Sequence, residues 1–461
     1  MLRTMPKTGD KINSLGFGMM RLPGKLGKID QAQATKLVAH ALNQGVNYFD
    51  TAYLYPGSEE ATGAAIEALG CRKDVYIATK LPLFVLKNLN DAKKIFEQHF
   101  KRLKTDYIDY YLLHNISSYE QYTQIADMGV VDFLVAEMSQ GRIRRLGFSY
   151  HGNRSDFKRI LDARDWDFCQ IQLNYLDEEF QAGVEGLAYA KEKGVGVVVM
   201  EPLRGGLLAN SVPKDALTEI SKLEIVQRAS NTIAPTAPTT NSNSTSNTTS
   251  NANATPTSTT PATATTSTSE SAATNQQGAH TLLAQRESRT YTPTPAQLAL
   301  RWVLNNDGVI CALSGMRAIE ELDSNAQAAM DLEPGGMCAD EVNAVEYAKK
   351  LFNEKIKVLC TGCGYCLPCP HKVNIPLAFA QYNNKHVTRS INATAMYITS
   401  LLTGGRREGA SSCVGCHLCE KKCPQSLPIA DLMPMVKKDM EKPYLVYPVR
   451  FALHVMKAFR R

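Results

Sequence analysis

Short apolar runs alternate with longer amphipathic stretches along most of the chain. From Asn13 onward the short runs are rich in β-branched and aromatic residues, as in buried strands, and the longer stretches repeat apolar residues at the helical period. Strands are predicted at residues 15–22, 47–52, 75–81, 107–114, 143–149, 168–174, 196–201 and 309–314, and helices at 31–43, 58–69, 90–103, 180–193 and 295–305. Strands that each lead into a helix favour a closed parallel barrel, a (β/α)8 TIM barrel of the α/β class.

The alternative for this pattern is an open, doubly wound sheet. That fold is disfavoured because no Gly-rich phosphate-binding turn follows the first strand. A barrel takes about 250 residues, and the chain has 461. We therefore expect two domains, a barrel over residues 1–332 and a second unit over 333–461, with the Pro-Gly-Gly sequence after Glu333 at the boundary and a helix at 340–355.

A low-complexity stretch interrupts the barrel pattern between the seventh strand and its helix. Residues 231–280 consist mostly of Thr, Asn, Ser, Ala and Pro, which offer too little apolar surface to offset the entropy of ordering. We expect a disordered loop insertion on one face of the barrel. A passive insertion is favoured over a functional lid.

Two cysteine runs dominate the C-terminal part. Each has three cysteines at intervals of three and then a fourth followed by proline, so that a coiled loop places three sulfurs around one centre. The eight cysteines are Cys360, Cys363, Cys366, Cys369, Cys413, Cys416, Cys419 and Cys423. Paired Cys₄ zinc sites are the alternative, but zinc ligands usually come as separated pairs. A disulfide framework is disfavoured further because the chain shows no signal peptide.

The second run resembles the bacterial ferredoxin motif, which implies two 4Fe-4S clusters. By that resemblance the fourth cysteine of each run serves the other cluster. Cys423 would then complete the set of the first run, and Cys369 the set of the second. The first run departs from the motif, with two residues before Cys369 where ferredoxins have three. Helical segments at 376–383 and 392–402 predict a mostly helical ferredoxin-like domain.

Composition fits a soluble globular protein and excludes several classes. Hydrophobic residues make up 44% and charged residues 21%, and no apolar stretch reaches membrane-spanning length. We expect no transmembrane segment and a cytoplasmic location. The formal charge of +6 falls to about +2 once eight thiolates hold two clusters, so we expect no nucleic-acid partner. The basic tail 444–461 carries a short apolar stripe, for which docking on the protein's own surface is favoured over a membrane surface.

Polar residues stand at the ends of three adjacent predicted strands. Asp50 and Tyr55 follow the second strand, Lys80 ends the third and His114 ends the fourth. Active sites of such barrels lie at the C-terminal ends of the strands. Each residue alone is typical of a solvated rim, but together they point to one site.

These four residues, with their five-residue step from Asp to Tyr, resemble the catalytic tetrad of the aldo/keto reductase family. The resemblance implies an oxidoreductase that reduces a small carbonyl substrate with NADP(H) or NAD(H). Tyr55 would be the general acid, since the alkoxide formed by hydride addition needs a proton. Lys80, held by Asp50, would lower the pKa of the Tyr55 phenol, and His114 would position the carbonyl oxygen.

The resemblance extends to the nicotinamide cofactor site. It implies that Ser149 and Gln170 bind the nicotinamide amide, and that the segment with Gly315, Arg317 and Asn325 binds the adenosine phosphate end. Three residues depart from the family pattern: Tyr150 where Asn is usual, Met200 where an aromatic residue stacks on the nicotinamide, and Glu321 where an Arg often binds phosphate.

Two functions remain open from sequence. The first is carbonyl reduction accompanied by 4Fe-4S electron transfer, with a redox partner protein for the clusters. Hydride carries two electrons together and a cluster passes one at a time. The alternative is therefore an iron–sulfur electron carrier or redox sensor whose barrel binds a nucleotide or partner without turnover.

Overall fold

Eight parallel strands close into a barrel in the computed structural model, which describes residues 1–25, 28–227, 289–330, 332–388, 391–402 and 407–448. The strand order around the barrel is β10-β11-β14-β3-β6-β7-β8-β9. The strands are β3 (Leu15–Gly18), β6 (Tyr48–Asp50), β7 (Tyr76–Pro82), β8 (Ile108–Ile116), β9 (Ile143–Tyr150), β10 (Phe168–Gln172), β11 (Gly196–Met200) and β14 (Val309–Ser314). The predicted (β/α)8 fold is therefore confirmed.

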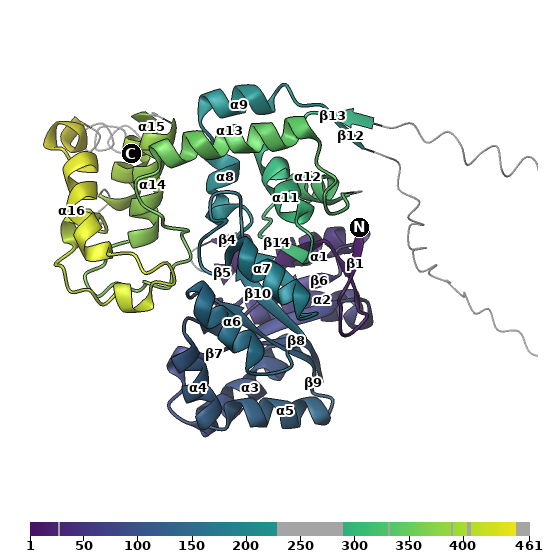
Figure 1. Ribbon diagram of the computed structural model, residues 1–461. Helices are drawn as coiled ribbons and strands as arrows, with labels where there is room; N and C mark the ends of the chain where they lie inside the picture. The colour runs from purple at the N-terminus through teal and green to yellow at the C-terminus, as the bar shows by residue number, and fades with distance from the viewer. Residues whose placement is uncertain (26–27, 228–288, 331, 389–390, 403–406, 449–461) are drawn as a thin grey trace, which may run out of the picture. The chain divides into compact units, whose positions relative to one another are not determined.

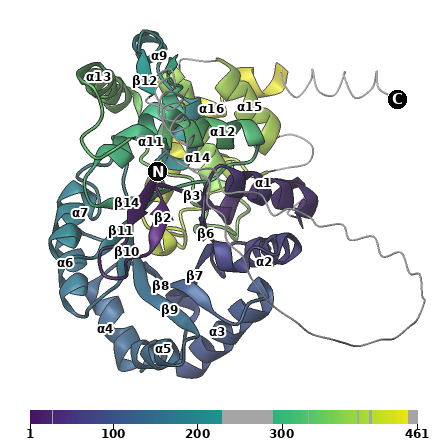
Figure 2. The ribbon, with the colours of Figure 1, turned by 90° about the vertical axis from the view of Figure 1, so that its right-hand side faces the viewer.

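Helices surround the strands, as Figure 2 shows for α2 to α7. They bury apolar faces against the outside of the barrel, as for Ile95 and Phe96 of α3. The barrel helices are α1 (Gln31–Asn43), α2 (Ser58–Leu69), α3 (Leu89–Leu103), α4 (Tyr119–Asp127), α5 (Val130–Ser139), α6 (Arg154–Asp162), α7 (Gly183–Glu192), α8 (Leu207–Asn210), α9 (Lys214–Ile220), α11 (Pro295–Asn305) and α12 (Ile319–Ala329).

Local sequence explains where several helices begin. Thr294 caps α11 in a reciprocal capping box with Gln297, and Pro295 takes the first helical position, where no N–H is needed. Asn88 caps α3 through its side chain.

An N-terminal hairpin, β1 (Leu2–Thr4) and β2 (Lys11–Asn13), precedes the barrel. The sequence pattern does not predict this hairpin, because three-residue strands are too short to show alternation. Met5 and Ile12 are fully buried and pack with interior barrel side chains such as Tyr110. A methyl group on Gly196 would come within 2.3 Å of the Met5 sulfur, so a larger residue there would force the Met5 side chain to shift. The hairpin thus closes the end of the barrel opposite the strand C-termini.

The cysteine-rich module has a core of its own. Val358 and residues of three helices form it, separate from the barrel core. The helices are α14 (Ile375–Thr388), α15 (Ile391–Leu401) and α16 (Ile429–Met440), labelled in Figure 1. The mostly helical character predicted for this module is confirmed. The preceding helix α13 (Ala339–Lys355) packs into the barrel core through residues such as Phe352.

Short elements connect these parts. They are the strands β4 (Gly24–Lys25), β5 (Lys28–Ile29), β12 (Ile225–Gln227) and β13 (Arg289–Tyr291), and the 3-10 turns η1 (Met19–Arg21), η2 (Arg72–Asp74), η3 (Leu83–Val85), η4 (Arg204–Gly206), η5 (Ala410–Ser412) and η6 (Glu420–Lys422). The barrel and the module belong to one compact unit.

Some predictions concern residues outside the described part of the chain. Most of the insertion at 231–280 and the end of the tail, 449–461, lie there. Within the described residues, no helix has both the length and the apolar character needed to cross a bilayer.

Candidate active site and iron–sulfur centres

Three strand ends bring the predicted tetrad together. Asp50 is the last residue of β6, Lys80 lies on β7 and His114 on β8, so parallel pairing places them at one end of the barrel. The Lys80 ammonium donates to the Asp50 carboxylate at 2.6 Å and to the Thr51 carbonyl at 2.7 Å. Lys80, Asp50 and His114 are each at most 4% exposed. The structure thus holds the lysine in place as predicted from sequence.

Tyr55 lies in the loop after β6, beside the other three. Its ring is 6.1 Å from the His114 ring and its ring centroid is 5.1 Å from the Lys80 ammonium nitrogen. All four predicted residues therefore surround one point at the mouth of the barrel.

The pKa of the Tyr55 phenol differs from the prediction made from sequence. Burial raises the pKa of the Tyr55 phenol well above its ordinary value, and the oxygens of Tyr365 and Asp50 raise it further. The pKa of Tyr55 is therefore raised, where the sequence predicted a lowering by Lys80, because burial outweighs the effect of that charge. Burial, with the Lys80 charge second, lowers the pKa of His114 well below its ordinary value, so the imidazole is neutral. The site thus holds two neutral hydrogen-bonding side chains at neutral pH.

A fifth side chain, Tyr365, enters this site from the cysteine module. Its hydroxyl oxygen lies 2.9 Å from Nε2 of His114 and is hydrogen-bonded to the Tyr55 hydroxyl. Tyr365 stands between Cys363 and Cys366 in the first cysteine run. Sequence reasoning missed it, because nothing in the motif indicates what the residues between the cysteines contact.

The predicted nicotinamide residues lie beside the tetrad. Gln170 on β10 donates from Nε2 to the second oxygen of Asp50 at 3.1 Å, and Ser149 on β9 accepts from the Asn115 backbone N–H at 2.8 Å. Both are buried. Tyr150, which replaces the usual Asn, is turned away from the mouth and donates to the Asn153 carbonyl at 2.5 Å.

The predicted adenosine-phosphate residues lie after β14. Gly315 and Arg317 are exposed, and Asn325 on α12 is buried and donates to the Ser314 hydroxyl at 3.0 Å. The Glu321 carboxylate accepts the Arg317 backbone N–H at 2.7 Å. A carboxylate therefore already accepts one of the backbone N–H groups of this segment.

Glu201 follows β11 and lies beside the first cysteine loop, residues 360–369. Burial raises the pKa of Glu201 to about 7, and one oxygen of its carboxylate has no hydrogen-bond partner within the described residues. Because the pKa in the folded state exceeds the ordinary glutamate value of 4.5, the free energy of unfolding should fall as the pH rises from about 4.5 to 7 and stay low above it.

We expect Glu201→Gln to remove this loss of stability. The variant should be more stable than the wild type at pH 8 by about 1–3 kcal/mol, which thermal unfolding would show as a Tm several degrees higher. The difference should shrink steadily toward pH 5. An equal Tm for both proteins at pH 8 would contradict the raised pKa.

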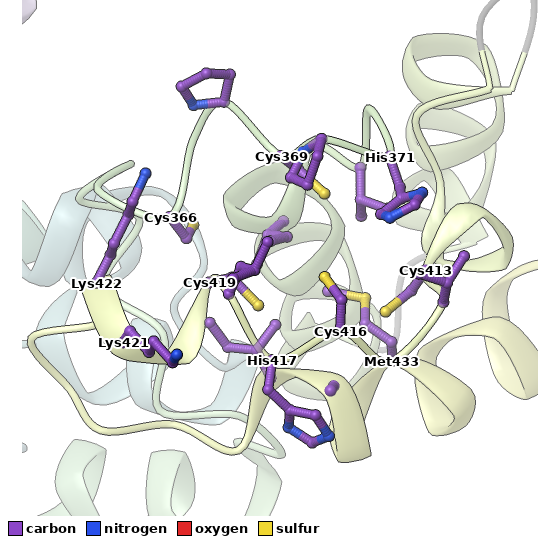
Figure 3. A pocket seen from close by; sticks show the side chains of 18 residues that line it. Cys366, Cys369, His371, Cys413, Cys416, His417, Cys419, Lys421, Lys422 and Met433 are labelled. Atoms are coloured by element: carbon purple, nitrogen blue, oxygen red, sulfur yellow. The ribbon is translucent and has the colours of Figure 1, made fainter.

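Five cysteines from both runs line the larger of two cavities in the module. Cys369, Cys413, Cys416 and Cys419 surround a space of about 400 Å³ that Cys366 also lines, and Figure 3 shows their side chains around it. Cys369 reaches this group despite the shortened spacing before it. Within the described residues no group of three or more His, Cys, Asp or Glu side chains is placed to hold a single metal ion, which disfavours zinc, whereas thiols spread around a cavity suit a 4Fe-4S cluster.

The second cavity shows the reciprocal arrangement. Cys360, Cys363 and Cys366 line it together with Cys423 of the other run. The structure thus places the fourth cysteine of each run with the first three of the other, as in two-cluster ferredoxins.

Burial disfavours the thiolate form of these cysteines. It raises the pKa of Cys360 to about 11 and those of Cys363 and Cys366 to about 12. Thiolate ligands at these positions therefore require the positive charge of iron, and cluster assembly would release their protons. The residues present fit two clusters.

The first cysteine loop is fastened to the barrel mouth by polar contacts. Arg21 donates to the carbonyls of Gly205 at 3.0 Å and Gly362 at 3.5 Å. Gln425 donates to the side chain of Gln172, the last residue of β10, at 2.8 Å. A methyl group on Gly205 would lie 2.0 Å from the Thr361 carbonyl oxygen, so only glycine allows this contact. The loop that carries Tyr365 therefore packs directly against the strand ends.

A parallel barrel with Asp, Tyr, Lys and His at its mouth defines a class of nicotinamide-dependent oxidoreductases. The profile of the aldo/keto reductase family matches residues 14–334, and that of a 4Fe-4S dicluster domain matches residues 359–427. The chain belongs to the aldo/keto reductase family, and it is an NAD(P)H-dependent oxidoreductase with a C-terminal 4Fe-4S domain.

Known relatives cover the barrel. The chain is 25% identical to the L-galactose dehydrogenase of Arabidopsis thaliana over 75% of this chain and 93% of the relative, and 26% identical to the NADH-specific methylglyoxal reductase of Escherichia coli over 44% and 68%. Among solved structures, it is similar to the aldo-keto reductase AKR11C1 from Bacillus halodurans, with a TM-score of 0.50 and 23% identity over 75% of this chain and 95% of that one. These relatives support the family and the barrel fold.

Proposed function

We propose that this protein reduces a small carbonyl compound with NAD(P)H, with Tyr55 as the general acid. The observation that carries the proposal is the convergence of Tyr55, Lys80, Asp50 and His114 at one point of the barrel mouth. The two named relatives act on L-galactose and methylglyoxal, which are small carbonyl-bearing or alcohol compounds.

Each side chain has a role that its contacts support. When bound, the nicotinamide supplies hydride to the carbonyl carbon, and the oxygen gains the electron pair of the broken π bond. Tyr55 gives its phenolic proton to that oxygen, which completes the alcohol. Lys80 lies close to the Tyr55 ring and stabilises the phenolate that remains. His114, neutral in this site, orients the carbonyl oxygen through Nε2.

We assign the binding of the nicotinamide amide to Gln170 and Ser149. Gln170 already bonds to Asp50, so a nicotinamide amide bound there would be linked to the tetrad through one hydrogen bond. Gly315, Arg317 and Asn325 are assigned to the adenosine end.

The clusters would be held by the two crossed cysteine sets, and they transfer single electrons. We propose that they exchange these electrons with a redox partner protein. Both cavities lie in the module, and the first cysteine loop contacts the barrel mouth.

The test is hydride transfer itself. Cluster-loaded protein prepared without oxygen is mixed with methylglyoxal and NADH or NADPH deuterated at the transferred position. We expect deuterium on the carbon of the alcohol product. Failure of the loaded protein to reduce methylglyoxal and a panel of aldehydes and ketones with either nucleotide would overturn the proposal.

The charge of Glu321 predicts a preference between NADH and NADPH. Its carboxylate should repel a 2′-phosphate, so we expect NADH to bind at least as tightly as NADPH. Glu321→Arg should improve NADPH binding over NADH by roughly tenfold, since a guanidinium binds phosphate well. Isothermal titration of both nucleotides checks this, with Glu320→Arg on the same helix as a control for the change in charge. Equal effects of the two substitutions would show that position 321 does not face the phosphate.

A second function, an electron carrier or sensor whose barrel does not turn over, is favoured by one observation. Tyr365 occupies the hydrogen-bonding groups of both Tyr55 and His114. The deuterium experiment separates the two functions, because a carrier would show reversible cluster reduction without labelled product.

A further inference from the structure

A groove runs from Tyr55 along the boundary between the barrel loops and the cysteine module. It encloses about 850 Å³. One wall comes from loops after barrel strands, with Met20, Leu54 and Phe84, and the other from the first cysteine loop, with Tyr365 and Leu367. The module therefore provides one wall of the space next to the predicted acid.

The groove exposes apolar side chains that come from separate parts of the chain. Phe84 is 55% exposed, Met20 41% and Leu367 37%. Exposed apolar side chains that converge in a hollow beside polar groups are typical of ligand sites. The remaining rim carries both signs of charge, with Lys372, Lys422 and Glu408, so it does not select a strongly charged ligand. These walls suit an uncharged compound with an aryl or alkyl body.

The Tyr365 hydroxyl lies at the end of the groove where Tyr55 and His114 meet. Nδ1 of His114 has no hydrogen-bond partner within the described residues. We assign the imidazole proton to Nε2, because buried N–H groups without partners are rarer than such acceptors. Nε2 of His114 and the hydroxyl of Tyr55 then meet at the oxygen of Tyr365. A substrate carbonyl oxygen would make the same two contacts.

We propose that this groove is the substrate pocket, that it takes a neutral aldehyde or ketone with an apolar body, and that the carbonyl oxygen displaces the Tyr365 hydroxyl from Tyr55 and His114. This inference rests on the proposed carbonyl reductase function and names its substrate class. The cysteine module is then part of the substrate site.

Binding measurements without turnover test the proposal. Full-length, cluster-loaded protein is saturated with oxidised nucleotide, which cannot reduce a ketone, and titrated with acetophenone or acetone. We expect acetophenone to bind at least tenfold more tightly than acetone, since its ring buries apolar area in the groove.

Phe84→Ala should weaken acetophenone binding by roughly fivefold to tenfold, from the lost apolar contact, and leave acetone unchanged. Val85→Ala is the matched control, because Val85 is the next residue of η3, is 40% exposed and does not line the groove. Equal effects of the two substitutions on acetophenone binding would overturn the pocket.

Tyr365→Phe removes the competing hydroxyl and keeps the ring. We expect both ketones to bind roughly threefold to tenfold more tightly, the worth of one neutral hydrogen bond. Iron content and the cluster spectrum should match the wild type and so show that the loop is intact. Unchanged or weaker binding with intact clusters would refute the displacement.

The two proposals fail in different ways. If the two ketones bind as described but no deuterium is transferred from either nucleotide, the groove proposal is supported and the reductase function is contradicted. If deuterium is transferred to methylglyoxal but Phe84→Ala does not change acetophenone binding, the reductase function is supported and the groove proposal is contradicted.

Discussion

Tyr55→Phe is expected to lower kcat for carbonyl reduction by roughly a hundredfold to ten-thousandfold, the usual contribution of a positioned general acid. The phenyl ring keeps its place beside His114 and Lys80, but no proton reaches the carbonyl oxygen as hydride arrives. Nucleotide affinity and Tm should change little, because the substitution removes one hydroxyl only. Transfer of deuterium from labelled nucleotide measures the rate.

Tyr53→Phe is the matched control. Tyr53 lies in the same loop, and its hydroxyl donates to Gln98 on the outside of the barrel at 2.9 Å. We expect its turnover to equal that of the wild type. A Tyr55→Phe protein that keeps most of its rate would show that the proton comes from another group.

Pairs of cysteine substitutions should reveal which sulfurs share a cluster. The wild type, purified without oxygen, should contain about eight iron atoms per chain, and Cys360→Ser or Cys423→Ser alone about four. The double variant Cys360→Ser/Cys423→Ser should still contain about four, because both residues line the same cavity. Substitutions that damage one shared site are not additive.

The opposite pair supplies the comparison. Cys413 and Cys423 belong to one run in sequence but to different cavities. Cys413→Ser/Cys423→Ser should therefore lose nearly all iron, and Cys338→Ser, at an exposed cysteine before α13, should lose none. Iron and sulfide analysis with electron spin resonance of the reduced protein gives the counts. Retention of four irons by the Cys413/Cys423 pair would show uncrossed ligation, and zinc without iron would exclude clusters.

Much of the fold was predictable because its signals are local. Eight buried strands and their amphipathic helices leave periodic patterns within short windows, and all eight strands appear where they were predicted. The hairpin β1–β2 was missed because its strands are too short for a pattern. Its importance lies in the burial of Met5 and Ile12, which only the closed barrel can provide.

The candidate site was predictable in part. Asp50, Lys80 and His114 could be placed together because parallel strands in a barrel end at the same side. The pKa values in the site could not be predicted from sequence, since the pKa of Tyr55 depends on burial and on oxygens brought near it by folding. The shortened spacing before Cys369 likewise left its position open until the structure placed it beside Cys413, Cys416 and Cys419.

The sequence by itself determined the barrel, the tetrad residues and the presence of a cluster module, because periodicity and motif spacing are properties of neighbouring residues. Only the tertiary structure decided how the module meets the barrel. Tyr365 and His114 are 251 positions apart in the chain, and no local pattern encodes a contact over that separation. Side-chain packing between two surfaces, such as Gly205 against Thr361, sets it.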